Sequence, residues 1–258
     1  MLCIICDTLS LMEDKDLLEK FNKSKEAKTM AIAYGGDGHL LDVASRVGNK
    51  KGIIPIRNYG LCEKHKGILE AVVEKNDSFK HGLKYSKQHF IDYCLDGKQN
   101  VLVGQAKGPI SEIVWKCANP TEALRFTVLV DGKEYMKQCI ADGIICATAL
   151  GSHGYFKSVT RTIFNDTESL GLGFIAPTYG LCNLVLKSTS KVKIVLERDA
   201  MTMLSGDKCF KEIQCSRGAS LDLQLSVEGV ALYGYDIFCC PECRRLRNST
   251  IVNDQYFG

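Results

Sequence analysis

The first ninety residues alternate between short apolar runs and helical stripes, and this alternation constrains the fold most. Apolar runs at residues 2–6, 29–33 and 52–56 have the length of buried strands. Each is followed by a segment with apolar residues at helical spacing, at residues 13–22, 40–44 and 68–73. Strands that alternate with helices predict a mostly parallel sheet with helices on its faces.

Further along the chain the hydrophobic period becomes that of strands. Apolar residues alternate at 124–130 and 221–227, and we expect turns at Asp131-Gly132 and Glu228-Gly229. The fold class predicted is therefore α/β. We expect an N-terminal α/β domain with a mostly parallel sheet over residues 1–95, with residues 240–258 as a candidate completion. A β-rich, β-sandwich-like domain follows over residues 96–240.

Charge and cysteine usage favour a soluble cytoplasmic protein. Thirty-three Lys and Arg against 30 Asp and Glu leave a net charge of +3, which is too mild to indicate a nucleic-acid partner. We expect no membrane partner, because no run approaches the roughly 20 apolar residues of a spanning helix. The 13 cysteines are scattered and odd in number, which is typical of reduced thiols in a reducing compartment.

A glycine-rich loop lies between the second apolar run and its helix. Residues 34–38 read Tyr-Gly-Gly-Asp-Gly, so the backbone can approach a ligand and present N–H groups at a helix start. The carboxylate of Asp37 can hold Mg²⁺ or take the proton from an attacking hydroxyl. The alternative is an ordinary Gly/Asp turn. The loop lacks the Gly-Lys-Ser/Thr of a Walker loop.

A second loop, over residues 142–158, follows another apolar strand. Hydroxyls at Thr148, Ser152 and Ser158 and the ring of Tyr155 suit the phosphates, ribose and base of a nucleotide. The alternative is a polar strand-to-helix connection with Tyr155 in the core.

Together the two loops resemble motifs of the NAD kinase family. That family carries Gly-Gly-Asp-Gly-Thr early in the chain and, later, Asp-Gly followed by Thr-Pro-Thr-Gly-Ser-Thr-Ala-Tyr. Here the later motif is matched at Asp142, Gly143, Thr148, Gly151, Ser152, Tyr155 and Ser158. The family's intervening Asn-Glu pair is best matched by Ser111-Glu112. Its later Arg-Pro-Leu-Val segment and Asp-Gly turn resemble residues 182–185 and Glu228-Gly229, so the resemblance covers nearly the whole chain.

The resemblance implies ATP-dependent phosphorylation of the adenosine ribose 2′-hydroxyl of NAD, with Mg²⁺ or another divalent cation accompanying ATP, by a homodimer or homotetramer. Asp37 would be the catalytic residue, engaging the ribose hydroxyl or organising the metal and phosphates. The implied substrate and nucleotide-binding residues are Gly35, Gly36, Gly38, His39, Leu41, Ser111, Glu112, Asp142, Thr148, Gly151, Ser152, His153, Gly154, Tyr155 and Ser158.

Three departures from the family pattern leave other functions open. Family threonines are replaced by His39 and His153, and the family asparagine by Ser111. The histidines either approach the same phosphates or metal, or cap turns and face solvent. The alternative functions are a catalytically weakened or inactive nucleotide-binding homologue, and a lipid or small-molecule kinase with the same glycine loop.

Thiols near the C-terminus raise a separate question. Cys239, Cys240 and Cys243, with Cys209 or Cys215, have the ligand type of a zinc site, but their spacing is not diagnostic, and buried or tail thiols are the default interpretation. Trp115 is expected in the core rather than in a pocket.

Overall fold

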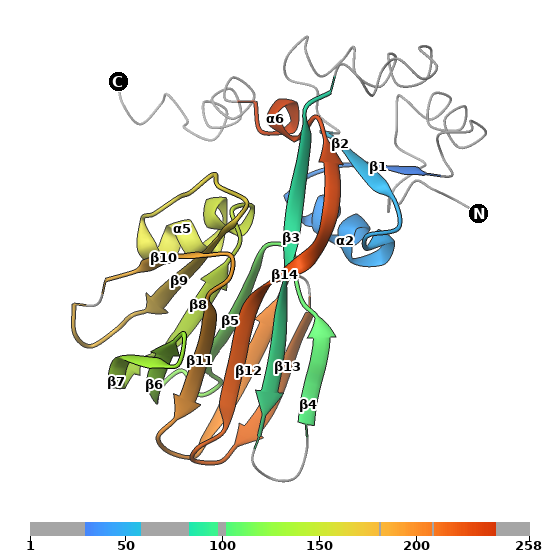
Figure 1. The fold of residues 1–258 in the computed structure, drawn as a ribbon. Coiled ribbons are helices and arrows are strands. Elements are labelled where there is room, and N and C mark those ends of the chain that lie inside the picture. Colours follow the sequence, from blue (N-terminus) through green and yellow to red (C-terminus); the bar gives the residue numbers. More distant parts are fainter. Residues whose placement is uncertain (1–28, 58–82, 98–101, 181, 208, 241–258) are drawn as a thin grey trace, which may run out of the picture. The chain divides into compact units, whose positions relative to one another are not determined.

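The computed structural model describes residues 29–57, 83–97, 102–180, 182–207 and 209–240 (Figure 1). The strand predicted at residues 2–6, the helices predicted at 13–22 and 68–73, and Cys243 lie outside them. The chain divides into two compact units, residues 1–87 with 230–258 and residues 88–229. The sequence placed these limits somewhat further along, at residues 95–96 and 240. In the described part of the chain, no helix has the length and apolar character needed to span a membrane.

The first unit contains the parallel strands that the alternation predicts. β1 (Met30–Tyr34) leads into α2 (Asp37–Val47), and β2 (Gly52–Ile56) returns beside β1 in parallel register. α2 buries its apolar stripe, and the end of β14 (Ser220–Tyr233) adds a parallel pairing to β2. The four-residue helix α6 (Tyr235–Phe238) follows. Because β1 and β2 are parallel and joined through α2, their carboxyl ends lie at the same edge of the sheet.

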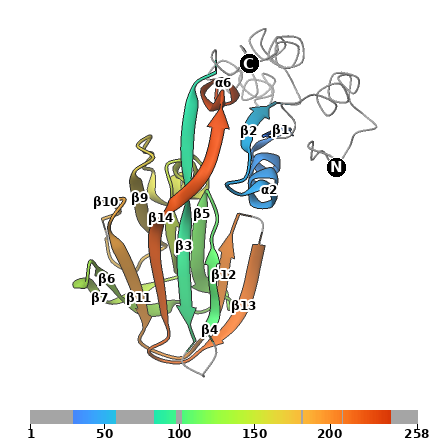
Figure 2. The ribbon, with the colours of Figure 1, turned by 45° about the vertical axis from the view of Figure 1, so that its right-hand side comes forward.

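The second unit consists of two antiparallel sheets (Figure 1). Figure 2 shows the same ribbon turned about the vertical axis. One sheet has the strand order β4-β3-β14-β11-β6-β7 and the other β10-β9-β8-β5-β12-β13. Their bounds are β3 (Tyr85–Asp96), β4 (Leu102–Lys107), β5 (Glu112–Cys117), β6 (Leu124–Val130), β7 (Lys133–Ala141), β8 (Gly143–Ala147), β9 (Ser169–Ile175), β10 (Leu184–Lys187), β11 (Lys191–Leu196), β12 (Ala200–Gly206) and β13 (Cys209–Cys215).

One apolar core lies between these sheets. Alternate residues of each strand enter it, including the fully buried Phe126 on one sheet and Trp115 on the other. The rings of Phe126 and Phe174 stack with centroids 6.4 Å apart. A core made by the inner faces of two sheets is that of a β-sandwich. The predicted fold class, an α/β domain followed by a β-rich sandwich, is therefore confirmed.

The helix α5 (Tyr155–Thr160) covers part of the outer face of the second sheet. Its buried Phe156 packs against outward-facing apolar residues of β5 and β8. On β9 the outward positions are Gly171 and Gly173, where a Cβ would lie 2.8 Å from the Phe156 ring or 2.4 Å from Thr160. The alternation of large and glycine residues along β9 therefore lets α5 approach the sheet closely.

One predicted turn is confirmed and the other is wrong. Asp131 and Gly132 join β6 to β7 with φ values of 52° and 76°, as a two-residue hairpin with both central residues at positive φ requires. Glu228-Gly229 instead lies inside the continuous strand β14. A Cβ at Gly229 would lie 2.4 Å from the carbonyl oxygen of Gln88 on β3, so this glycine serves close backbone approach rather than a turn.

We therefore expect Gly229→Ala to destabilise the protein by about 1–3 kcal/mol, because backbone must shift to admit the methyl group. Gly180→Ala is the matched control, since a Cβ there meets nothing within 4 Å. Its effect should stay within about 0.5 kcal/mol. Urea unfolding of both variants checks this, and equal midpoints would contradict it.

Candidate functional site

The first glycine loop lies where β1 ends and α2 begins. The Gly35 N–H donates to the carbonyl of Ile56, the last residue of β2, at 2.8 Å. The carbonyl of Gly36 accepts from the N–H groups of His39 and Leu40, both at 3.1 Å. Asp37 is the first residue of α2, and its side chain is 64% exposed. The loop thus presents an accessible carboxylate at a helix start, where sequence reasoning placed it.

Arg57, which sequence reasoning missed, holds this carboxylate. Its Nη1 and Nη2 donate to Oδ2 and Oδ1 of Asp37 at 3.2 and 3.0 Å, which makes a bidentate pair. The Arg57 side chain is only 10% exposed. The one available signal was its position, a cation directly after a buried strand that runs parallel to β1.

The remaining residues predicted in this loop lie on α2. Gly38 is exposed, and His39 and Leu41 are half-buried. A Cβ at Gly35 would lie 2.9 Å from the Cβ of His39, so glycine there gives this histidine its room.

The second loop is fastened to the start of β5. The N–H of Thr148 donates to the Ser111 carbonyl at 2.9 Å, and its hydroxyl donates to the Ile110 carbonyl at 2.6 Å. A Cβ at Gly151 would lie 2.1 Å from the Ser111 carbonyl oxygen. Thr148 and Gly151 therefore act by holding backbone together.

The other predicted residues of this loop divide into buried and exposed groups. Ser152 is fully buried, and its hydroxyl bonds to backbone groups of Ala149 and Phe164. His153 is half-buried in the 3-10 turn η3 (Gly151–His153) and bonds to Asn165 Oδ1 at 3.1 Å. Asp142, Gly154, Tyr155 and Ser158 are exposed. Tyr155 is 43% exposed, so it is not a core residue.

This folding brings Glu112 to the beginning of α5. Burial raises the pKa of Glu112 to about 7, with a smaller contribution from the neighbouring Asp207 and against the lowering effect of hydrogen bonding with Ser111 and with the Tyr155 N–H. Such a carboxyl group can donate a hydrogen bond below neutral pH and accept one above it.

Asp207 is a second residue that sequence reasoning missed. Burial raises its pKa, and the hydroxyl of Ser111 and the backbone N–H groups of Ile110 and Ser111 donate to its carboxylate. It follows the last residue of β12 at φ 47°. The signal was Gly206-Asp207, a turn-forming pair directly after an alternating run.

No group of three or more metal-ligating side chains converges among the described residues. Cys215 lies in the sandwich core beside Thr202, and Cys239 and Cys240 lie at the end of α6. The zinc hypothesis also involves Cys243, which is outside the described residues, and stays a prediction. Burial raises the pKa of the Cys139 thiol to about 11, which makes that group a poor nucleophile.

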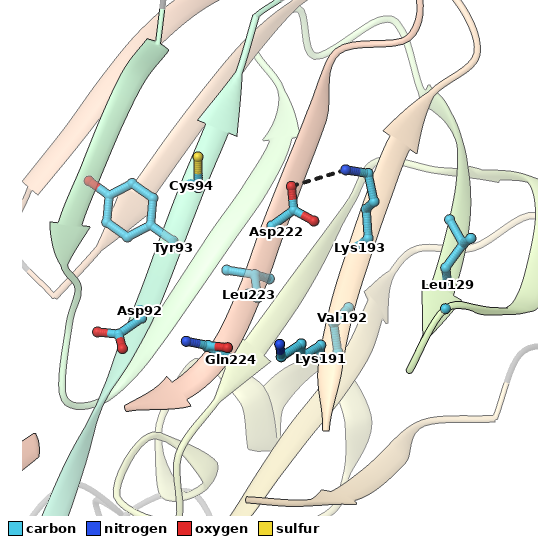
Figure 3. A pocket seen from close by; sticks show the side chains of 11 residues that line it. Asp92, Tyr93, Cys94, Leu129, Lys191, Val192, Lys193, Asp222, Leu223 and Gln224 are labelled. Carbon is cyan, nitrogen blue, oxygen red and sulfur yellow. Dashed lines mark hydrogen bonds and ion pairs between the residues drawn. The ribbon is translucent and has the colours of Figure 1, made fainter. Parts of the chain in front are cut away.

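A hollow of about 590 Å³ lies on the outer face of the sheet that contains β3, β14 and β11 (Figure 3). It is lined by side chains of β3, β11 and β14, among them the pair of Lys193 and Asp222 at 3.2 Å. None of the predicted site residues lines it. We therefore take each of the two loops as a candidate site by itself, the first in the first unit and the second in the second unit.

Comparisons with known proteins find similarity at the level of structure. No protein family model matches the chain, and no curated sequence matches it. Yeast NADH kinase in complex with NADH has a TM-score of 0.67 and 17% identity, over 80% of this chain and 61% of that one. An NAD kinase from Archaeoglobus fulgidus in complex with ATP has a TM-score of 0.64 and 17% identity, over 87% of this chain and 91% of that one. The chain thus spans less than two thirds of the yeast enzyme, and it shares the fold of both kinases.

The raised pKa of Glu112 predicts a pH-dependent stability. Between pH 4.5 and about 7 the folded protein holds a proton that the unfolded chain releases, so this group lowers stability as pH rises. Glu112→Gln removes the effect. The thermal midpoint of this variant, relative to that of the wild type, should rise from pH 5 to pH 7. Above that range the difference between the two midpoints should stay constant. Parallel curves would contradict the assignment, as would an NMR titration that places the Glu112 carboxyl near pH 4.5.

Proposed function

We propose that the protein is an ATP-dependent kinase that phosphorylates the adenosine ribose 2′-hydroxyl of NAD to give NADP. The observation that carries the proposal is Asp37, an accessible carboxylate at the start of α2 in a glycine loop. The fold shared with two kinases, whose structures hold NADH and ATP, supports it.

In this proposal the first loop serves phosphoryl transfer. The glycines at 35, 36 and 38 let phosphates approach the backbone, and the carboxylate of Asp37 accepts the hydrogen bond of the 2′-hydroxyl. The hydroxyl oxygen attacks the terminal phosphorus of ATP, the bond to ADP breaks, and the hydroxyl proton passes to Asp37. Catalysis of such a transfer depends mainly on positioning and on charge neutralisation.

A divalent cation fits this site as a companion of ATP. Protein Mg²⁺ sites of this kind use one or two carboxylates together with substrate phosphates and water. The proposal assigns the exposed carboxylate of Asp37 to the 2′-hydroxyl, so the cation would be held mainly by the phosphates of ATP and by water. The described residues form no cluster of three or more metal-ligating side chains. When bound, Mg²⁺ would neutralise charge on the phosphates.

The second loop would take the dinucleotide. The exposed ring of Tyr155 offers a stacking surface, and the carboxyl of Glu112 offers a hydrogen-bonding group for a sugar or a base. Thr148 and Ser152 would act indirectly, because their hydroxyls already bond within the loop. A homodimer or homotetramer remains part of the proposal through the family resemblance.

One observation favours the alternative of nucleotide binding without catalysis. Arg57 occupies one hydrogen-bonding site on each oxygen of Asp37, and Ser111 gives its hydroxyl to Asp207. Both groups are thereby partly engaged within the protein. Turnover decides between the two functions.

We expect purified protein to convert NAD or NADH to its 2′-phosphate with ATP and Mg²⁺. Asp37→Asn should fold normally and lose at least about a hundredfold in kcat, because it removes the proton acceptor. Formation of NADP or NADPH, followed by a coupled dehydrogenase assay, measures this. Asp42→Asn, on the same helix, is the matched control and should retain activity.

Full activity of Asp37→Asn would exclude the proposed role of this carboxylate. Nucleotide binding without any phosphorylated dinucleotide would favour the non-catalytic function. Binding of ATP without binding or phosphorylation of NAD or NADH would favour a kinase for lipids or other small molecules.

A further inference from the structure

Arg57 is fixed on several sides within the first unit. Besides its two bonds to Asp37, its Nε donates to the carbonyl of Phe238 at 3.2 Å. Its guanidinium carbon lies 3.8 Å from the centroid of the Phe238 ring, at a cation–π distance. The carbonyl and the ring of Phe238, at the end of helix α6, therefore fix the guanidinium of Arg57. The guanidinium in turn fixes the carboxylate of Asp37.

The contacts leave part of the Asp37 carboxylate available. A carboxylate has about four hydrogen-bonding sites, and Arg57 uses one on each oxygen. The Asp37 side chain remains 64% exposed, whereas that of Arg57 is 10% exposed. The carboxylate is thus the solvent-facing member of the pair, and the planar guanidinium fixes its orientation.

A bare carboxylate in a phosphate-binding loop presents an electrostatic problem. ATP is a polyanion, and like charges a few ångströms apart repel each other. Nη1 of Arg57 lies 3.9 Å from the position that a Cβ of Gly36 would occupy, so its positive charge lies beside the loop backbone. Tyr235, next to this pair, adds no further negative charge, because burial raises the pKa of its hydroxyl.

We propose that Arg57 is a positioning residue that orients Asp37 and cancels its charge, so that a nucleoside triphosphate binds to a neutral pair. The proposal rests on the phosphate-binding role proposed for the first loop. It also makes α6 a functional element, because the Phe238 ring and carbonyl fix the guanidinium.

Calorimetric binding of MgATP, without NAD, tests the charge role. Affinity should follow the net charge of the pair. Arg57→Met leaves an unopposed carboxylate and should weaken binding about tenfold, whereas Asp37→Asn should strengthen it. The double variant restores a neutral pair and should return to within about threefold of the wild type. The thermal midpoint of each variant verifies that it is folded.

The kinase assay tests the positioning role. Arg57→Lys keeps the charge and loses the two-pronged geometry, so the KM for ATP should stay near the wild-type value while kcat falls about tenfold or more. If Arg57 only stabilised the fold, Arg57→Lys would not lower kcat selectively while the KM for ATP stayed unchanged. Phe238→Leu removes the ring and keeps the backbone carbonyl, and it should lower kcat as well.

Arg46→Met is the matched control. Arg46 lies near the other end of α2 in an exposed pair with Asp42, about 13 Å along the helix axis from Asp37 and beyond the screening length of physiological salt. Its MgATP affinity and kcat should not change.

Three results would overturn the proposal. A double variant that binds as weakly as Arg57→Met would mean that Arg57 contacts phosphate directly, and an unchanged affinity of Arg57→Met would exclude charge compensation. Absence of MgATP binding by the wild type would overturn it as well. Normal MgATP binding without NADP formation would instead overturn the proposed kinase function and leave the charge role standing.

Discussion

The form of the second loop depends on one close approach between two backbone segments. The carbonyl oxygen of Ser111 lies where a side chain at position 151 would be, so only glycine admits the contact. Thr148 closes the same junction with its N–H and its hydroxyl. Since η3 and α5 follow directly, this junction determines where α5 begins and thus which backbone N–H reaches Glu112.

The helix after this junction is short and draws its stability from packing rather than from its own length. Six residues make a poor isolated helix, because forming the first turn is costly. Phe156 lies against β9, where Gly171 and Gly173 leave room for the ring and for Thr160. The glycines of a strand and those of a loop thus cooperate in placing one helix terminus.

Sequence patterns predicted the elements and the two loops because both depend on local period and on glycine position. Asp37 could be singled out as a candidate in this way, and the turn at Asp131-Gly132 could be predicted. Glu112 became a candidate only through the resemblance to the NAD kinase family. Arg57 and Asp207 could not be identified from the sequence, because each meets its partner through a pairing of segments 20 and 96 residues apart. Glu228-Gly229 was misread for a related reason, since a turn and a close strand crossing both select glycine.

Acidic side chains lie in the first loop and beside the second, in places proposed to receive polyanions, and their negative charge is limited differently in the two places. Asp37 is compensated by a guanidinium that is held by a distant helix. Burial raises the pKa of Glu112 to about 7, so this group carries a proton in part of the molecules near neutral pH. Burial also raises the pKa of Asp207, whose carboxyl group accepts hydrogen bonds from two backbone N–H groups and a hydroxyl. A bare carboxylate repels a phosphate-bearing ligand, so the guanidinium beside Asp37 and the raised pKa of Glu112 act in the same direction.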